Sequence, residues 1–327
     1  MNYIDMHCDT LMEVAMANGP KTDMFHRENV CIDFERMQKG GVMAQFFAIF
    51  VMPKYGYQEW YNVEAMEDDA YVQRCIDLFN YNMELHPDII RPARSAEDVL
   101  SNAAAGLLSG MLTIEDGGFV NGTLEKIKDC YDKGIRVFGL TWNGKNCLGT
   151  PNSPDADVMN EGLTDFGKEA VDYMQSLGMV VDVSHLNDGG FYDIAARCKK
   201  PFVATHSNCR AVSPHPRNLT DEMIRILADK GGVMGLNFCA EFLDKDITNQ
   251  DSTIDRMVAM LQHTYQIGGR DVMAIGTDFD GIRSNLEIKD CSQLPLLTDA
   301  LKKAGFSDDD LDYITHKNVL RALHDAM

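Results

Sequence analysis

The feature of this sequence that most constrains its fold is a repeated alternation of apolar and helical segments. Eight apolar stretches rich in β-branched residues recur along the chain, with helical patterns between them: Tyr3–Met6, Val42–Val51, Gly110–Glu115, Ile135–Trp142, Met179–His185, Phe202–His206, Gly232–Phe238 and Val272–Asp278. Strands that are apolar throughout are typical of sheets covered on both faces, and strands that alternate with helices form parallel sheets. The pattern therefore predicts a parallel α/β sheet.

The length of the chain narrows the architecture further. Its 327 residues lie within the range of about 200 to over 400 residues that (β/α)₈ barrels occupy. We therefore predict an α/β fold, a (β/α)₈ TIM barrel with extra helices around Trp60–Leu85 and Asp308–Ala326. No linker or low-complexity segment divides it, so residues 1–327 are expected to form a single domain. The alternative is a doubly wound open sheet, but no G-x-G-x-x-G motif follows the first strand.

Charge and cysteine usage exclude several classes of partner. Acidic residues outnumber basic ones 50 to 30, which gives a net charge of −20, and such a surface repels nucleic acid. Nine cysteines without a C-x-x-C pair favour a reducing compartment over a disulfide scaffold. No apolar run approaches the roughly 20 residues of a membrane span, and no signal peptide or lipid anchor is recognisable. We expect a cytoplasmic protein with no nucleic-acid or membrane partner.

Ionisable residues follow the predicted strands at the points where they end. The residues concerned are His7, Asp9, Glu115, His185, His206 and Asp278. Each alone is more often a structural polar group, but barrels of this kind place their active sites at the carboxyl ends of the strands. His7 and Asp9 also lie two residues apart, so in a strand they face the same side. The pattern predicts that all six converge on a metal site.

The residue types indicate which metal chemistry this site would carry. Mixed imidazole and carboxylate ligands suit Zn²⁺, without excluding Mn²⁺, Co²⁺ or Fe²⁺. Three histidines and three carboxylates exceed the needs of one tetrahedral ion, whereas two ions about 3.5–4 Å apart could share a carboxylate and activate a water between them. Glu115 is our candidate for the shared carboxylate. Asp278 is our candidate for accepting a proton and delivering it to a leaving amine.

The motifs "DMHCDT", "TIEDGG", "VDVSHL", "ATHSN", "HPRNL" and "GTDFDG" together resemble the membrane (renal) dipeptidase family, binuclear zinc peptidases among the amidohydrolase-like barrels. The resemblance runs from about residue 3 to the C-terminal helices. It implies two Zn²⁺ ions, the first held by His7 and Asp9, the second by His185 and His206, with Glu115 bridging. It also implies that Asp278 is catalytic, that Arg217 binds the terminal carboxylate of the substrate, and that the protein forms a homodimer.

Two positions depart from the family pattern. Better-known members have a histidine after the fourth strand that contacts the carbonyl region of the substrate, whereas this chain has Trp142 in "LTWNGKN". A tyrosine that helps to hold the substrate carboxylate is replaced by Cys239. Either Asn143 or Asn146 could supply the missing polar contact, or Trp142 could narrow the pocket. These departures leave the metal ligands intact and affect specificity.

The expected activity is zinc-dependent hydrolysis of free dipeptides by a hydroxide that bridges the metals, with tolerance of a C-terminal D-residue implied by the resemblance. The first alternative is an amidohydrolase that acts on N-acyl-amino acids or lactams at the same binuclear site. A phosphoesterase or deaminase matches only the His-x-Asp opening. A non-catalytic metal-binding protein would need a broken ligand set, and no ligand is missing from the sequence. The preferred dipeptide, the physiological metal and the oligomeric state do not follow from the sequence.

Overall fold

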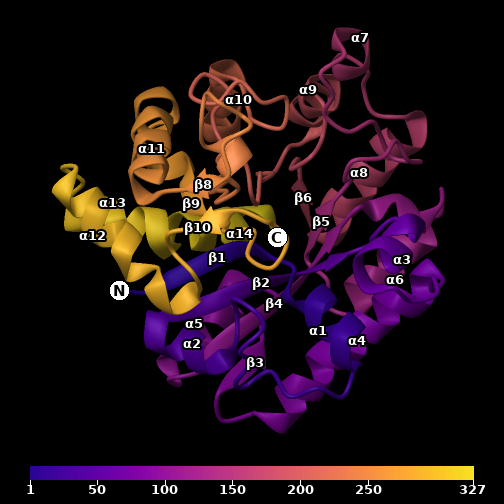
Figure 1. Ribbon diagram of the computed structural model, residues 1–327. Coiled ribbons are helices and arrows are strands. Elements are labelled where there is room, and N and C mark those ends of the chain that lie inside the picture. The colour runs from indigo at the N-terminus through magenta and orange to yellow at the C-terminus, as the bar shows by residue number, and fades with distance from the viewer.

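The centre of the fold is a curled parallel sheet, seen in the computed structural model, which describes all 327 residues (Figure 1). Seven strands form it in the order β6-β5-β4-β2-β1-β9-β7. Their bounds are β1 Tyr3–Cys8, β2 Val42–Phe50, β4 Leu108–Glu115, β5 Val137–Gly139, β6 Val180–Asp182, β7 Met234–Leu236 and β9 Met273–Ile275. The sequence did not indicate β3 (Ile90–Pro92), which pairs with β4 outside this path, or the small β8 (Asp251–Ser252) and β10 (Asn285–Leu286) pair.

The ring closes between β6 and β7 through a segment that is not a regular strand. Val203 forms a single parallel bridge to Asp182 of β6, and Ala204 forms another to Met234 of β7. The predicted strand Phe202–His206 therefore has the right place in the barrel but is wrong as a continuous strand. The reason is that the next backbone donor, Thr205 N–H, bonds to the Asp182 side chain at 2.9 Å. With this segment as its sixth member, the predicted barrel is confirmed, and the open-sheet alternative is wrong.

Several strands end earlier than the apolar runs suggested. The fifth was predicted to reach His185 and the eighth Asp278, but β6 stops at Asp182 and β9 at Ile275. His185 and Asp278 have φ angles of 68° and 63°, in the left-handed region that a strand cannot include. The polar residues thus lie on turns directly beyond the strands, and these turns aim their side chains at the ring axis.

Helices surround the sheet and close the barrel at the amino ends of its strands (Figure 1). They are α1 Thr10–Asn18, α2 Phe34–Gly40, α3 Lys54–Tyr61, α4 Asp68–Leu85, α5 Ala96–Ala104, α6 Leu124–Asp132, α7 Ala156–Met159, α8 Asp165–Leu177, α9 Asp188–Arg197, α10 Asp221–Asp229, α11 Ile254–Gly268, α12 Pro295–Lys303, α13 Asp308–Asp312 and α14 Asn318–Ala326. The helical insertion predicted at Trp60–Leu85 is mostly α4, preceded by the shorter α3. None of these helices is both long and apolar enough to cross a bilayer.

Two apolar clusters divide the core. The larger, of 74 residues, lies mainly between the sheet and its outer helices. The smaller, of 18 residues, joins Ile4, Met6 and Phe46 of the strands to Val319 and Leu323 of α14. Because the C-terminal helix packs against the strand residues nearest the amino ends, it closes that end of the barrel. A substrate can reach the ring interior only from the opposite end, where the polar residues gather.

Candidate active site

The first two candidate ligands come from the end of β1, where the strand is irregular. The register of β1 against β2 shifts between Asp5 and Cys8, which interrupts the simple alternation of side chains. His7 and Asp9 are both buried, and His7 Nε2 lies 3.4 Å from Asp9 Oδ2. The two side chains therefore face the same point, as the sequence predicted, although Asp9 lies just beyond β1 at the start of α1 and not in the strand.

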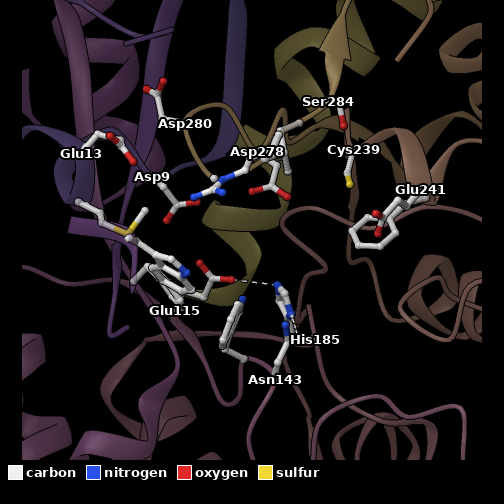
Figure 2. A pocket seen from close by; sticks show the side chains of 18 of the residues that line it. Asp9, Glu13, Glu115, Asn143, His185, Cys239, Glu241, Asp278, Asp280 and Ser284 are labelled. Atoms are coloured by element: carbon white, nitrogen blue, oxygen red, sulfur yellow. Dashed lines mark hydrogen bonds and ion pairs between the residues drawn. The ribbon is translucent and has the colours of Figure 1, made fainter. Parts of the chain in front are cut away.

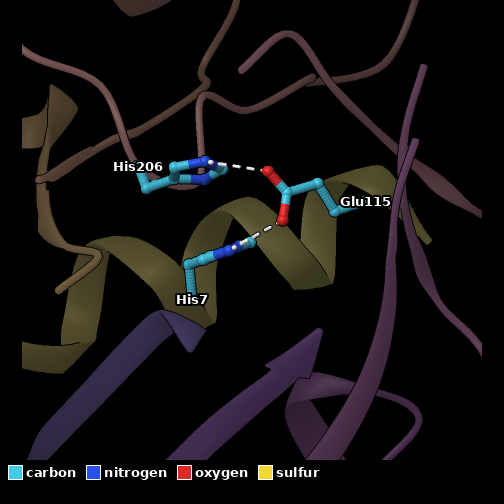
Figure 3. A group of neighbouring side chains, drawn as sticks. All are labelled: His7, Glu115 and His206. Atoms are coloured by element: carbon cyan, nitrogen blue, oxygen red, sulfur yellow. Dashed lines mark ion pairs between the residues drawn. The ribbon is translucent and has the colours of Figure 1, made fainter. Parts of the chain in front are cut away.

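Glu115, the last residue of β4, lies at the centre of the group (Figure 3). Its Oε2 is 3.3 Å from His7 Nε2, while its Oε1 is 2.9 Å from His185 Nε2 and 3.6 Å from His206 Nε2. One carboxylate oxygen thus faces the β1 side and the other faces the histidines across the ring. This is the arrangement that a carboxylate shared between two ions requires.

The three histidine rings crowd together in a way that their own hydrogen bonding does not explain. His185 Nε2 and His206 Nε2 are 3.0 Å apart, and the rings of His7 and His206 stack with centroids 3.7 Å apart. Burial lowers the pKa of His185 and of His206 well below the usual value. Both rings are therefore neutral, which is the protonation state that binds a metal.

In contrast to His185 and His206, the part of the site around Glu115 and His7 holds protons. Burial, reinforced by the nearby Asp9, raises the pKa of Glu115 to about 8. Burial alone would lower the pKa of His7, but Glu115 and Asp9 outweigh it and raise that pKa well above the usual value. Negative groups this close therefore need protons or cations between them.

The donor set fits divalent metal ions. His7 Nε2 and Asp9 Oδ1 are buried without a hydrogen-bond partner, and such atoms are rare in folded proteins unless something binds them. Two overlapping groups have donor atoms close enough to hold an ion, His7–Glu115–His206 and His7–Asp9–Asp278. His185 belongs to neither group, but its Nε2 lies 2.9 Å from Glu115 Oε1, so all five predicted metal ligands lie together. Asp278, predicted as the proton carrier, lies within the same cluster.

Asp278 is held by a residue that the sequence reasoning did not single out. Asn237, just after β7, donates from Nδ2 to Asp278 Oδ2 at 2.8 Å. The other oxygen, Oδ1, faces the metal cluster at 3.9 Å from His7 Nε2, and burial raises the pKa of this carboxyl. Asn237 is a polar residue at the end of a predicted strand, and this position is the same one that identified the candidate ligands in the sequence.

A second supporting residue is Asp182 at the end of β6. Its Oδ1 accepts from the backbone N–H groups of Ser184 and Thr205, each at 2.9 Å, and its Oδ2 accepts from the Thr205 hydroxyl. Ser184 and Thr205 directly precede His185 and His206. One buried carboxylate therefore fixes both histidine-bearing segments, as partners of metal ligands commonly do.

The cluster forms the floor of a cavity of about 590 Å³ at the carboxyl ends of the strands (Figure 2). An aromatic wall, which we define as Phe50, Trp60 and Trp142, lines part of it. Phe50 lies 4.9 Å from Trp142 and 6.2 Å from Trp60 between ring centroids, and Trp142 lies 6.4 Å from His185. The predicted residue Asn143 also lines the cavity, and its Oδ1 is 3.3 Å from His185 Nδ1. Asn143 is therefore placed to orient a metal ligand as well as to meet a substrate.

Arg217 is less open to the cavity than the sequence suggested. Its side chain is only 4% exposed, and its guanidinium donates to Ser207 Oγ at 2.7 Å and to the His206 carbonyl at 2.8 Å. It lies directly behind a candidate ligand, and its Nε has no partner. Cys239, the other departure from the family pattern, does line the cavity.

A parallel barrel whose strand ends bring imidazoles and carboxylates together has the arrangement of a metal-dependent hydrolase. The chain belongs to the membrane dipeptidase family, peptidase family M19, whose model matches residues 1–327. It is therefore a metallopeptidase of a dipeptidase family, as the motifs predicted.

Individual relatives agree with this assignment. A metallopeptidase from Rhodobacter sphaeroides, liganded with a phosphinate mimic of the dipeptide L-Ala-D-Ala, superposes with a TM-score of 0.91 at 26% identity, over 100% of this chain and 99% of that one. The metallopeptidase called dipeptidase AC superposes with a TM-score of 0.88 at 27% identity, over 99% of both chains. Dipeptidase aclJ of Aspergillus oryzae is 29% identical over 302 residues, which are 90% of this chain and 70% of that protein. An uncharacterised Klebsiella pneumoniae protein from the pqqA 5′ region is 36% identical over 241 residues, or 72% and 88%.

Proposed function

We propose that this protein is a binuclear zinc dipeptidase that hydrolyses the peptide bond of small, free dipeptides. The observation that carries the proposal is the position of Glu115, whose two oxygens face opposite halves of the ligand cluster. His7 and Asp9 would hold one ion on one side, and His185 and His206 the other on the far side. When bound, the ions would polarise the scissile carbonyl and lower the pKa of a water between them.

Asp278 is the residue we assign to proton transfer. Asn237 occupies its Oδ2, so Oδ1 is the oxygen free to accept a proton from the attacking water. A carboxyl whose pKa is raised by burial keeps that proton long enough to give it to the leaving amine. Because Asn237 also fixes the rotation of the carboxylate, the acceptor stays aimed at the cluster.

Substrate binding divides between two sides of the ring. Arg217 follows the sixth segment, and we assign its guanidinium to the terminal carboxylate, because a planar fork of donors matches two carboxylate oxygens. Phe50 and Trp60 of the aromatic wall lie at and beyond the end of β2, across the ring from that segment, and Phe50 packs against Trp142. We assign this wall, Trp142 included, to the N-terminal residue of the substrate. Asn143 lies beside it and would contact the same residue.

Tolerance of a D-residue at the C-terminal position is part of the proposal. The similar Rhodobacter sphaeroides structure holds a mimic of L-Ala-D-Ala, which supports it. The replacement of the family's tyrosine by Cys239 leaves a small side chain on the Arg217 side of the cavity. A C-terminal side chain of either configuration would find room there.

The test is hydrolysis of a dipeptide panel by metal-depleted protein before and after zinc is added. The panel contains L,L and L,D dipeptides with amidated and N-acylated controls. The proposal expects cleavage of free dipeptides that zinc restores, with no cleavage of N-acylated compounds. Cleavage of N-acylated compounds alone would keep the metal site and replace the substrate. Two bound ions without any cleavage would refute the dipeptidase activity.

A further inference from the structure

The charges that line the cavity are strongly unbalanced. Six carboxylates line it, namely those of Asp9, Glu13, Glu115, Glu241, Asp278 and Asp280. Apart from His185, the lining has one basic side chain, Arg283. Arg283 is exposed and forms no ion pair with any of these carboxylates. A guanidinium that faces a substrate cavity without a partner is available to an anionic group on the substrate.

The loop that carries Arg283 is fixed on both sides of it. The Asp280 carboxylate accepts from Thr10 Oγ1 at 2.5 Å and from Cys31 N–H at 2.7 Å. Ser284 Oγ accepts from Ala240 N–H at 2.9 Å, and Figure 2 shows Ser284 close to Cys239. The backbone at Arg283 is therefore tied to α1 at one end and to the loop after β7 at the other. The loop backbone is therefore already ordered before binding, and only the Arg283 side chain has to be fixed when a substrate binds.

Arg283 and Arg217 lie on the same half of the barrel. Arg217 follows the sixth segment, Cys239 follows β7 and Arg283 follows β9, and these three parts of the ring are consecutive. The terminal carboxylate and the C-terminal side chain of a dipeptide leave the same Cα, so a substrate whose carboxylate lies at Arg217 places that side chain in the half of the cavity that Cys239 and Arg283 line. Arg217 is buried and held by its hydrogen bonds to Ser207 and His206, whereas Arg283 is exposed and lines the cavity, so the two guanidinium groups are available to two different carboxylates.

We propose that Arg283 binds a carboxylate on the C-terminal side chain of the substrate, so that the preferred dipeptides end in aspartate or glutamate. This assignment rests on the proposed dipeptidase function. A bidentate guanidinium–carboxylate pair beside the metal ions gives specificity against neutral side chains of the same shape. It also explains how a cavity with six carboxylates accepts an acidic substrate.

The experiment compares isosteric substrates in the zinc-loaded enzyme. The kcat/KM ratio of Ala-Asp to Ala-Asn is measured for the native protein, for Arg283→Gln and for Arg225→Gln, each with L and D forms of the last residue. Arg225 is an exposed residue of α10 away from the cavity, so it controls for the loss of one positive charge. Native protein and R225Q are expected to favour Ala-Asp by roughly 10- to 100-fold, and R283Q to bring the ratio close to one.

Two results would overturn the proposal. The first is an unchanged ratio of Ala-Asp to Ala-Asn in R283Q; if both substrates fall equally while amidated dipeptides are unaffected, Arg283 binds the terminal carboxylate instead. The second is that this ratio stays unchanged while R283Q loses a preference for Asp-Ala over Asn-Ala, which would assign Arg283 to the N-terminal side chain.

A binding measurement separates this proposal from the proposed function. Calorimetric binding of analogues whose peptide bond is reduced to an amine gives the same Asp-to-Asn ratio without catalysis. A protein that cleaves no dipeptide but still loses this ratio in R283Q would refute the dipeptidase activity and retain the role of Arg283. Equal binding of both analogues by the native protein would refute the role of Arg283.

Discussion

Replacing Asp182 with alanine should weaken both the fold and the metal site, for a reason that the structure makes specific. The substitution removes the acceptor for two buried backbone N–H groups, those of Ser184 and Thr205, and for the Thr205 hydroxyl. Each donor left unpaired costs about 1–3 kcal/mol. For the three donors the total is about 3–9 kcal/mol, a large part of the roughly 5–15 kcal/mol that stabilises a typical domain.

The effect on the metal site follows from the positions of Ser184 and Thr205, which directly precede the candidate ligands His185 and His206. Ser184 and Thr205 position His185 and His206, and loss of a group that orients metal ligands typically costs about 10- to 100-fold in affinity. Zinc affinity measured by competition with a chelator should therefore fall by that factor in D182A. Asp182→Asn keeps one oxygen for the two N–H groups, so it should show a smaller loss in both measurements.

Asp33 provides a matched control. It is fully buried and accepts from the backbone N–H groups of Arg27 and Arg36, both at 2.8 Å, at the start of α2. Asp33→Ala should lower the free energy of unfolding in urea by a comparable amount and leave zinc affinity unchanged. If D182A kept native zinc affinity, or if D33A lost as much affinity as D182A, the assignment of Asp182 as a positioning residue would be wrong.

Two further predictions concern the metal cluster. In the metal-free protein Glu115 holds a proton below a pKa of about 8, and His7, whose pKa is raised well above its usual value, holds another. Zinc must displace both, so zinc affinity should rise with pH between 6 and 8, by up to about tenfold per unit for each proton. Glu115→Gln should make this dependence less steep, and a flat native profile would contradict it. A Cβ added at Gly281 would overlap the Asp9 carboxylate and lie 2.7 Å from Asp278 Oδ1. Gly281→Ala should therefore lower zinc affinity by about tenfold. Gly144→Ala, where a Cβ would meet nothing within 4 Å, should not, and equal titration curves for the two variants would refute the steric argument.

Much of the metal site was predictable because its signal is local. His7, Glu115 and His206 each end an apolar run, and the C-terminal ends of parallel strands meet at one edge by geometry alone. The same rule, applied to amides as well as to carboxylates, predicts that Asn237 belongs to the site. Position along a strand therefore carries most of the information about what faces the ring axis.

The remaining features depend on tertiary contacts that no local pattern shows. Asp182 acts through Thr205, which is 23 residues away in the sequence. The sixth apolar run resembles the others in sequence, yet the Asp182 side chain accepts from Thr205 N–H, one of the backbone donors of that run. Arg283 lies in a loop where no periodicity exists, and only the folded structure shows that it lines the cavity. The burial of Arg217 likewise does not follow from "HPRNL", the motif that identified it.

The irregular closure of the ring has a consequence for the lifetime of the protein. The segment Val203–Ala204 is joined to each neighbouring strand by one bridge only, so it is the part of the sheet that local unfolding should release first. It leads directly into His206, and a bound ion would tie that residue to His185 and to Glu115 at the end of β4. Metal supply would then set how often this segment opens to proteases, and a chain made without zinc would be degraded faster than a loaded one. Degradation would then remove the metal-free molecules, which are inactive.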